Sequence, residues 1–338
     1  MKPIIPIPYC FFALPLTVLS LLALMTLSTF SYANDTVHTS PSSVSAITSV
    51  KITDNTYIIH GISGLPTKEN QALIANLGFV VSQAGVIVID SGGSHAHGIL
   101  LLNEIARVTS APVVAVFNTH IHGDHWLGNN AIAQRFPKAV FYAHEKMVEQ
   151  ANNGAGNDWI TLFNTMTQGA LKDTQPYAPS HPLSDRNRFD FGNISITTYA
   201  KESAHTTTDI IVAVEEPQQK RVVFLGDTSS HLRLGRMDDG DFKGNISALD
   251  DAIALKADIY VPGHGPSTHN SSAAVLYRDY LALLYQETAR LYPQGLADFE
   301  IKEAIMPKFE RWRTWEGFES AFGRHVNLLY LEIEEAEF

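Results

Sequence analysis

The stretch Asn118-Thr119-His120-Ile121-His122-Gly123-Asp124-His125 decides how the rest of the chain is interpreted, because four of its eight residues can bind a metal ion. If the segment is extended up to His122, the side chains of His120 and His122 point to the same side and can bind one ion together. If the chain then turns into a helix, Asp124 and His125 point elsewhere and can bind a second ion. Gly123 supplies the conformational freedom for that turn. The spacing therefore predicts a two-metal site rather than a histidine-rich surface loop.

The composition is that of a globular protein with room for one large domain or two small ones. The chain has 338 residues, of which 45% are hydrophobic and 17% are charged. The net charge is −11, and the sequence contains no block of basic residues. Such a surface repels phosphate backbones on average, so we expect a small-molecule substrate and no nucleic acid as partner.

The N-terminal segment has the pattern of a secretory signal peptide. Lys2 is the only charged side chain before Asp35, residues 9–30 are apolar or small, and the run ends in Ser31-Tyr32-Ala33. This pattern predicts a signal peptide over residues 1–33 that is cleaved after Ala33. The alternative is an uncleaved anchor, because the apolar run is long enough to span a bilayer.

Export has consequences for the chemistry that the mature protein can perform. We expect a periplasmic or secreted protein that begins with a flexible lead-in over residues 34–48 and is not inserted stably in a membrane after cleavage. The single cysteine, Cys10, lies in the predicted signal peptide. The mature chain would then have no thiol, which suits an oxidising compartment. Histidine and carboxylate side chains must therefore supply any metal ligands.

The following part of the chain, residues 49–271, alternates strand and helix patterns, which is typical of a layered α/β fold. Strands are predicted at residues 56–60, 78–82, 85–90, 113–117, 139–143, 194–199, 210–214, 221–225 and 258–261. Helices are predicted at residues 97–108, 126–136, 144–172 with an interruption, and 248–255. Residues 173–188 are predicted to be a loop, and residues 272–338 a C-terminal helical extension.

Three further ligand candidates lie near predicted strand ends, each beside small residues: His205, Asp227 and His264. With them the ligand set is complete for two ions. We expect one ion to be bound by His120, His122 and His205, the other by Asp124, His125 and His264, and both by the carboxylate of Asp227. Nitrogen and oxygen ligands without sulfur suit Zn²⁺, although Fe, Mn or Co would fit similar ligands.

The order and spacing of these residues resemble the metallo-β-lactamase superfamily over residues 50–268. The matching motifs are Thr119-His120-x-His122-x-Asp124-His125, His205 with Asp209, Gly226-Asp227, Gly263-His264-Gly265, and Asp90 at the end of its strand. The resemblance implies an αββα sandwich with the metals at one edge, between two sheets. It also implies that Asp90 and Asp209 lie behind the ligands and orient them through hydrogen bonds.

The bridging position indicates a branch of that superfamily. The zinc β-lactamases resemble this chain in the histidine-rich motif, but they carry Cys or Ser in the region of Asp227. The chain is therefore more similar to the glyoxalase II, lactonase and general metallo-hydrolase branches. Residues 236–251 and the tail with Trp312, Trp315 and Tyr330 resemble exported proteins of the SoxH and quinoprotein-relay type.

The resemblance implies an exported dinuclear zinc hydrolase. A hydroxide that bridges the two ions would attack an ester, thioester, lactone or amide carbonyl. Asp124 would orient this nucleophile and accept its proton. The proton for the leaving group could come from a metal-bound water. His231 is a second candidate donor of this proton, but the sequence favours an exposed loop histidine there. We expect His95 and His97 at the start of a helix near the rim of the site.

Several alternatives remain open at this stage. They are β-lactamase activity, an iron-dependent oxidoreductase with a similar ligand set, and a non-catalytic zinc-binding protein. The C-terminal extension could cover a sheet edge, form a homodimer or shape the substrate pocket. Lys308, Arg311 and Arg313 could contact an acidic substrate, although a solvated helix face is the simpler interpretation. Selectivity is expected to reside in loops at residues 62–72, 150–188 and 228–245.

Overall fold

The computed structural model describes residue 44 and residues 47–337. The predicted signal peptide over residues 1–33 and most of the predicted lead-in lie outside the described residues. Within the part that is described, no helix combines the length and the apolar character needed to cross a membrane.

The first sheet contains seven strands in the order β1-β2-β3-β4-β5-β6-β7. The strands predicted at residues 78–82 and 85–90 form a hairpin, since β3 (Leu77–Ser82) pairs antiparallel with β4 (Gly85–Ile89). Strands β4, β5 (Val113–Phe117) and β6 (Val140–His144) are parallel, so their carboxyl ends lie at the same edge. The remaining strands are β1 (Val50–Lys51), β2 (Thr56–Ile59) and β7 (His181–Leu183).

The second sheet contains five strands in the order β12-β11-β10-β9-β8. Its strands are β8 (Arg188–Asp190), β9 (Ser195–Ala200), β10 (Ile210–Glu215), β11 (Arg221–Ser230) and β12 (Ile259–His264). The pair β11 and β12 is parallel, and its register is irregular between Gly226 and Ser230. This irregularity lies where Asp227 leaves the regular ladder.

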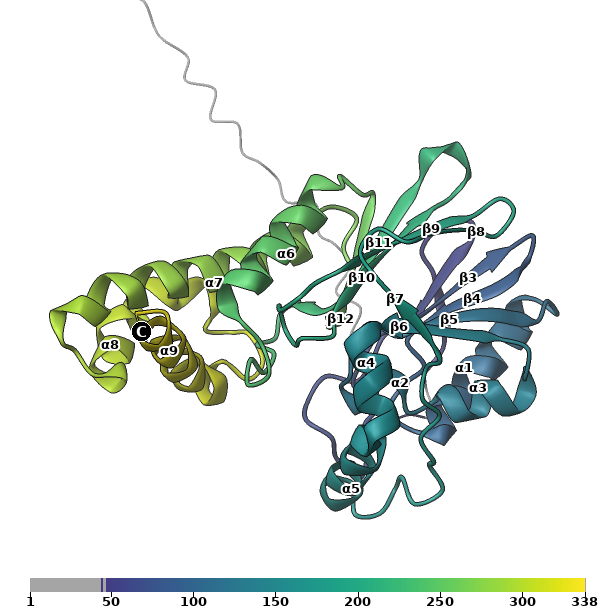
Figure 1. Cartoon of the computed structure of the whole chain (residues 1–338), viewed down its shortest axis with the longest axis horizontal. Coiled ribbons are helices and arrows are strands. Elements are labelled where there is room, and N and C mark those ends of the chain that lie inside the picture. The colour runs from purple at the N-terminus through teal and green to yellow at the C-terminus, as the bar shows by residue number, and fades with distance from the viewer. Residues whose placement is uncertain (1–43, 45–46, 338) are drawn as a thin grey trace, which may run out of the picture. The chain divides into compact units, whose positions relative to one another are not determined.

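The two sheets face each other across one apolar layer, and helices cover both outer faces (Figure 1). Alternate residues of one strand serve different layers: in β10, Ile210, Val212 and Val214 pack between the sheets, while Ile211 and Ala213 pack against helices. Such strands, apolar on both faces, form only in the middle of a layered structure. The predicted αββα sandwich is therefore confirmed.

The first sheet is covered by α1 (His95–Val108) and α3 (Asn129–Arg135), which follows the short helix α2 (Gly123–Trp126). The helical periodicity of the sequence puts Ile99 and Ala106 on one side of α1 with Ile105, but both are exposed whereas Ile105 is buried. The buried face instead includes Gly98, where an added Cβ would lie 2.3 Å from the carbonyl oxygen of Gly128. The close approach of α1 to the chain at Gly128 buries the face of α1 that carries Gly98. The hydrophobicity of the side chains alone does not predict which face is buried.

Other predicted elements differ from the structure in their limits. The helix predicted over residues 126–136 is two helices, α2 and α3. Helix α4 (Glu145–Gln150) continues through a π-helical turn (Ala151–Ala155) into α5 (Gly156–Met166). The loop predicted over residues 173–188 contains β7, which is short and pairs only with β6. Strand β11 extends to Ser230, so Asp227 lies within it rather than after it.

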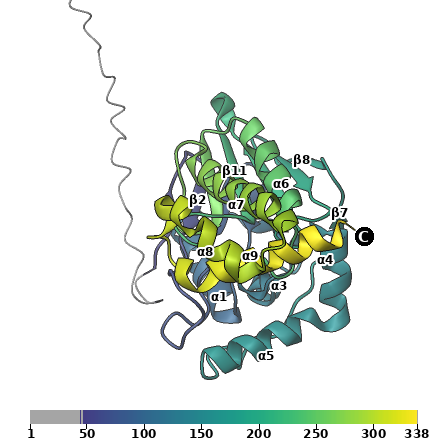
Figure 2. The same ribbon diagram turned by 90° about the vertical axis from the view of Figure 1, so that its left-hand side faces the viewer.

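The second sheet is covered by α6 (Phe242–Ala254) and α7 (Ser272–Leu291), and the chain after α7 continues as helices (Figure 2). These are α8 (Asp298–Ile305) and α9 (Phe318–Glu335), with short 3₁₀ turns at Tyr292–Gln294 and Met306–Trp312. Another short 3₁₀ turn, Pro217–Gln219, lies between β10 and β11. The side chain of Glu332 in α9 accepts a hydrogen bond of 2.8 Å from the backbone N–H of Phe242. The C-terminal helices are thereby joined to the start of α6.

Candidate metal centre

The seven predicted ligands lie together at the edge where the strands of both sheets end. The segment from Asn118 to His122 leaves β5, and α2 then carries Asp124 and His125. His205 lies in the loop between β9 and β10, Asp227 in β11, and His264 at the end of β12. All seven side chains are buried.

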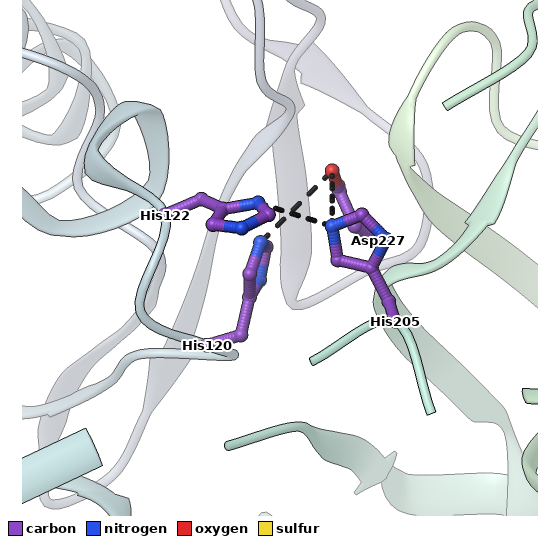
Figure 3. A group of neighbouring side chains, drawn as sticks. All are labelled: His120, His122, His205 and Asp227. Carbon is purple, nitrogen blue, oxygen red and sulfur yellow. Dashed lines mark hydrogen bonds and ion pairs between the residues drawn. The ribbon is translucent and has the colours of Figure 1, made fainter. Parts of the chain in front are cut away.

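The ligand atoms form two groups, within each of which they lie within 4.8 Å of one another: His120, His122, His205 and Asp227 in one, and Asp124, His125 and His264 in the other. The carboxylate of Asp227 contacts both groups (Figure 3 shows the first). Its Oδ2 lies 3.5 Å from Nε2 of His205 and 3.1 Å from Nε2 of His264, and its Oδ1 lies 3.2 Å from Nε2 of His125. This is the placement that the sequence predicts for a carboxylate shared by two ions.

Unpartnered polar atoms show that the residues fit bound cations. Among the described residues, buried Nε2 of His120, Nε2 of His125 and Oδ1 of Asp227 have no hydrogen-bond partner. A buried polar atom without a partner costs free energy, so such atoms are expected to meet a ligand. The donor set of imidazole nitrogens and carboxylate oxygens is one that Zn²⁺ and similar divalent ions accept.

Asp90 orients two parts of the histidine-rich segment, as the resemblance implies. Its Oδ2 lies 2.7 Å from Nδ1 of His125 and accepts a hydrogen bond from it. The same carboxylate accepts hydrogen bonds of 2.8 Å from the N–H and from the hydroxyl of Thr119. The nitrogen of His125 that faces the cluster is therefore Nε2, and it is the one that can bind a metal ion once the ring is neutral.

Asp209 acts at a greater distance from the ligands than the resemblance implies. Its Oδ2 accepts a hydrogen bond of 2.6 Å from the backbone N–H of Thr206, the residue after His205. No bond to a ligand's ring is present among the described residues, and Nδ1 of His205 has no partner there. Burial raises the pKa of Asp209 to about 8. Asp209 thus holds the loop that carries His205 instead of the ring itself.

Asp239 is a residue at the site that the sequence analysis missed. Its Oδ2 lies 3.0 Å from Nε2 of His122, so Nδ1 of His122 is left for a metal ion. The hydrogen bond with His122 is the main reason why the pKa of Asp239 is below its usual value. The acidic start of residues 236–251 was the available signal, but nothing in the sequence placed it beside His122.

Replacing Asp239 by asparagine is expected to weaken metal binding about 10- to 100-fold, because the partner that orients His122 loses its charge. Zinc affinity, measured by competition with a chromophoric chelator, tests this result. Asp238→Asn is the matched control, since Asp238 binds Arg324 and not a ligand. Equal zinc affinity in the two variants would contradict the orienting role of Asp239.

The protonation states at the cluster also suit metal binding. Burial lowers the pKa of His120 well below its usual value and that of His205 to about 3, so both rings are neutral at pH 7. Burial would raise the pKa of Asp227, but interaction with His264 and His125 holds it well below its usual value. Burial likewise opposes the charge on His125, yet Asp227, Asp90 and Asp124 raise its pKa well above its usual value. Metal binding must therefore release the proton of His125.

A cavity of about 330 Å³ opens beside the cluster and reaches His122, Asp124, Asp227 and His264. Its walls come from each of the three loop regions predicted to control selectivity, through residues such as Leu65, Trp159 and Arg233. The start of α9 also lines it, from Gly317 to His325. Of the roles considered for the C-terminal extension, shaping the pocket is the one that the geometry supports.

Several other histidines and basic residues lie elsewhere than expected. His231 is buried, and its Nδ1 lies 2.9 Å from the carbonyl oxygen of Pro266, so the interpretation as an exposed loop histidine is wrong. His97 is fully buried in the first turn of α1 rather than near the rim of the site. Its Nδ1 accepts a hydrogen bond from the backbone N–H of Gly93. Lys308 is paired with Glu287, and Arg313 is paired with Glu310 and Glu319, which leaves neither for an acidic substrate.

Comparison with known proteins gives a consistent assignment. The family model described as the Metallo-beta-lactamase superfamily matches residues 71–264. A linear primary-alkylsulfatase of Pseudomonas sp. (strain ATCC 19151) is 23% identical over 264 residues, which cover 65% of this chain and 48% of the relative. A "Probable metallo-hydrolase" of Streptococcus pyogenes serotype M6 is 24% identical over 205 residues, covering 57% of this chain and 80% of that protein.

Solved structures show the same fold. A stereoselective inverting sec-alkylsulfatase from Pseudomonas sp. superimposes with a TM-score of 0.64 at 17% identity, covering 84% of this chain and 50% of that one. A metallo-beta-lactamase from Pontibacter korlensis gives a TM-score of 0.54 at 22% identity, covering 70% of this chain and 99% of the other. The chain thus spans about half the length of the alkylsulfatases that it matches.

Proposed function

Because this chain belongs to the metallo-beta-lactamase superfamily, we propose that it is a hydrolase that holds two zinc ions and cleaves an ester, thioester, lactone or amide bond. One observation carries the proposal. The carboxylate of Asp227 lies between two groups of buried ligand atoms, several of which have no other partner among the described residues. A protein without metal-dependent chemistry gains nothing from burying these groups together.

The residues around the cluster can perform distinct tasks in hydrolysis. When bound, two divalent cations would supply Lewis acidity and lower the pKa of water between them toward neutrality. Asp124 lines the cavity, and its Oδ2 lies 3.4 Å from Nε2 of His264 and 3.7 Å from Nε2 of His125. Its carboxylate can orient an attacking water molecule and accept the proton. The apolar wall at Trp159 and Phe163 limits the access of bulk water.

Sulfate-ester hydrolysis is a second candidate function. It is favoured by one observation, the similarity in sequence and in fold to alkylsulfatases. Those proteins are about twice as long as the matched region, so their activity does not transfer without a test. The two candidates differ in the atom attacked, carbon in a carbonyl and sulfur or carbon in a sulfate ester.

The N-terminal segment supports a proposal for where in the cell the enzyme acts. The apolar run that ends in Ser31-Tyr32-Ala33 supports a periplasmic or secreted enzyme, released from the membrane after cleavage. The net charge of −11 supports a small-molecule substrate rather than nucleic acid. A homodimer remains a proposal, and the molar mass in solution tests it.

The test is a substrate panel of lactones, thioesters, β-lactams, phosphodiesters and alkyl sulfates. It is run on full-length protein that was produced with zinc and iron both available, with the metal content of each sample measured. We expect about two zinc ions per chain and turnover of at least one carbonyl substrate that chelation abolishes. Protein that binds no transition metal would overturn the proposal. Bound iron with a redox activity, or turnover restricted to alkyl sulfates, would replace it with the corresponding alternative.

A further inference from the structure

Two helix faces line the cavity. Helix α5 contributes Trp159, Leu162, Phe163 and Met166, and the start of α9 contributes Gly317, Ser320, Ala321 and Arg324. Both sets follow the spacing of a single helical face. The face of α5 is large and apolar, whereas that of α9 begins with the small residues Gly317, Ser320 and Ala321 and ends at Arg324. In the view of Figure 2, α9 lies above α5.

The apolar surface continues to the mouth of this cavity. Leu65 and Leu162 line it and remain exposed, at 67% and 43% of their surface. Exposed apolar side chains are common singly, but two on the rim of one cavity beside a metal cluster mark a place for an apolar ligand. The ring of Trp159 also stacks edge-on against His122, with 4.9 Å between ring centroids. The apolar wall therefore reaches the cluster.

The charge of Arg233 distinguishes the inner end of the cavity. Its guanidinium donates a hydrogen bond of 3.1 Å to the carbonyl oxygen of Gly64 and forms no ion pair among the described residues. Its other neighbour, Nδ1 of His264 at 3.5 Å, already donates to the carbonyl oxygen of Ile74 and cannot act as an acceptor. Arg236 and Arg324, also on the cavity wall, are both paired with Asp238.

We propose that this cavity selects an anionic amphiphile as the substrate of the hydrolase proposed above. The apolar chain of the substrate lies between α5 and the start of α9, and its carboxylate or sulfate group binds the guanidinium of Arg233. An unpaired, half-buried guanidinium recognises a planar or tetrahedral oxyanion through two parallel N–H donors. Since Arg233 lies next to His264, this arrangement places the bond near the anionic group at the cluster.

The experiment measures binding of probes that cannot be hydrolysed, so it does not depend on turnover. Full-length, metal-loaded protein is titrated with decanesulfonate, decanoate, decanol and decyltrimethylammonium below their micelle concentrations. Calorimetry gives the affinity, and the fluorescence of Trp159 reports occupancy of the cavity. We expect both anions to bind at least tenfold more tightly than decanol, and the ammonium compound to bind no more tightly than decanol. Comparing the two anions identifies the preferred head group.

Varying the alkyl chain length of the probe tests the apolar part of the proposal, and substituting Arg233 tests the anionic part. Affinity is expected to rise about threefold to fourfold per methylene from hexanesulfonate to decanesulfonate. Arg233→Met is expected to lower the affinity for decanesulfonate about 10- to 100-fold and to leave that for decanol unchanged. Arg313→Met makes the same change in charge at a paired residue outside the cavity, so it should alter neither. Ala321→Trp should abolish the dependence on chain length.

The metal content of every variant is measured, so that loss of metal is not mistaken for loss of the anion site. Equal binding of decanesulfonate by wild type and Arg233→Met would overturn the anionic part of the proposal. A lack of dependence on chain length in wild type would overturn the apolar part. Tight, Arg233-dependent binding without hydrolysis of any panel substrate would refute the proposed hydrolase and leave the recognition intact. Hydrolysis without such binding would refute the recognition alone.

Discussion

Replacing Asp227 by alanine is expected to reduce the bound metal to less than one ion per chain and to lower kcat/KM by a factor of about 10³ or more. That factor corresponds to ~4 kcal/mol of transition-state stabilisation. The physical reason is that one carboxylate contacts ligands of both groups, at 3.5 Å from Nε2 of His205 in the first and 3.1 Å from Nε2 of His264 in the second. Without it, the group of His120, His122 and His205 contains no carboxylate ligand. Metal analysis and turnover of the best substrate on the panel measure the two effects.

A thermal readout makes the Asp227 experiment independent of the substrate. Removing metal from wild-type protein should lower its Tm, because a ligand that binds only the folded state stabilises it. In Asp227→Ala this response to chelation should be absent. Asp190→Ala, at an exposed carboxylate that lies at 3.6 Å from Arg188, is the control and should behave as wild type. Two bound ions and full activity in Asp227→Ala would refute a shared carboxylate.

Gly263→Ala should disable the site almost as severely, although it removes no ligand. A Cβ added at Gly263 would lie 1.9 Å from Oδ1 of Asp227 and 2.7 Å from the backbone carbon of Gly226. These distances are far inside van der Waals contact, so Asp227 and its strand must move. A displacement of about 1 Å in a catalytic constellation costs on the order of 10² in rate. We therefore expect zinc affinity and kcat/KM to fall about 100-fold or more, as chelator competition and steady-state kinetics would measure.

The matched control for Gly263→Ala is Gly323→Ala in α9. There an added Cβ would meet only the flexible side chain of Lys302, with the nearest atom at 3.4 Å. Replacing a helical glycine by alanine raises the free energy of unfolding by up to about 1 kcal/mol, so this variant should keep its metal and gain slightly in stability. If Gly263→Ala retains wild-type zinc affinity, the close packing of β11 and β12 is not what positions Asp227.

The ligands themselves could be predicted from the sequence because their geometry is local. His120 and His122 alternate on one side of an extended segment, and the turn at Gly123 directs Asp124 and His125 elsewhere. Asp227 interrupts β11, His264 ends β12, and His205 lies in the loop before β10. Parallel neighbouring strands bring their carboxyl ends to one edge. The alternation of strand and helix patterns likewise predicted a layered α/β fold.

The tertiary structure alone decided which distant residues support the ligands and which enclose the substrate cavity. His122 and Asp239 are 117 positions apart, Asp209 binds the backbone beside His205 rather than a ring, and Arg233 lies next to His264 without a carboxylate partner among the described residues. These contacts depend on how loops and the C-terminal helices pack. The hydrophobic spacing within one segment does not predict that packing. The sequence by itself determined two groups of candidate metal ligands at the edge of a layered α/β fold. The substrate that this site can accept depends on the walls formed by α5 and α9, because those surfaces meet only in the folded chain.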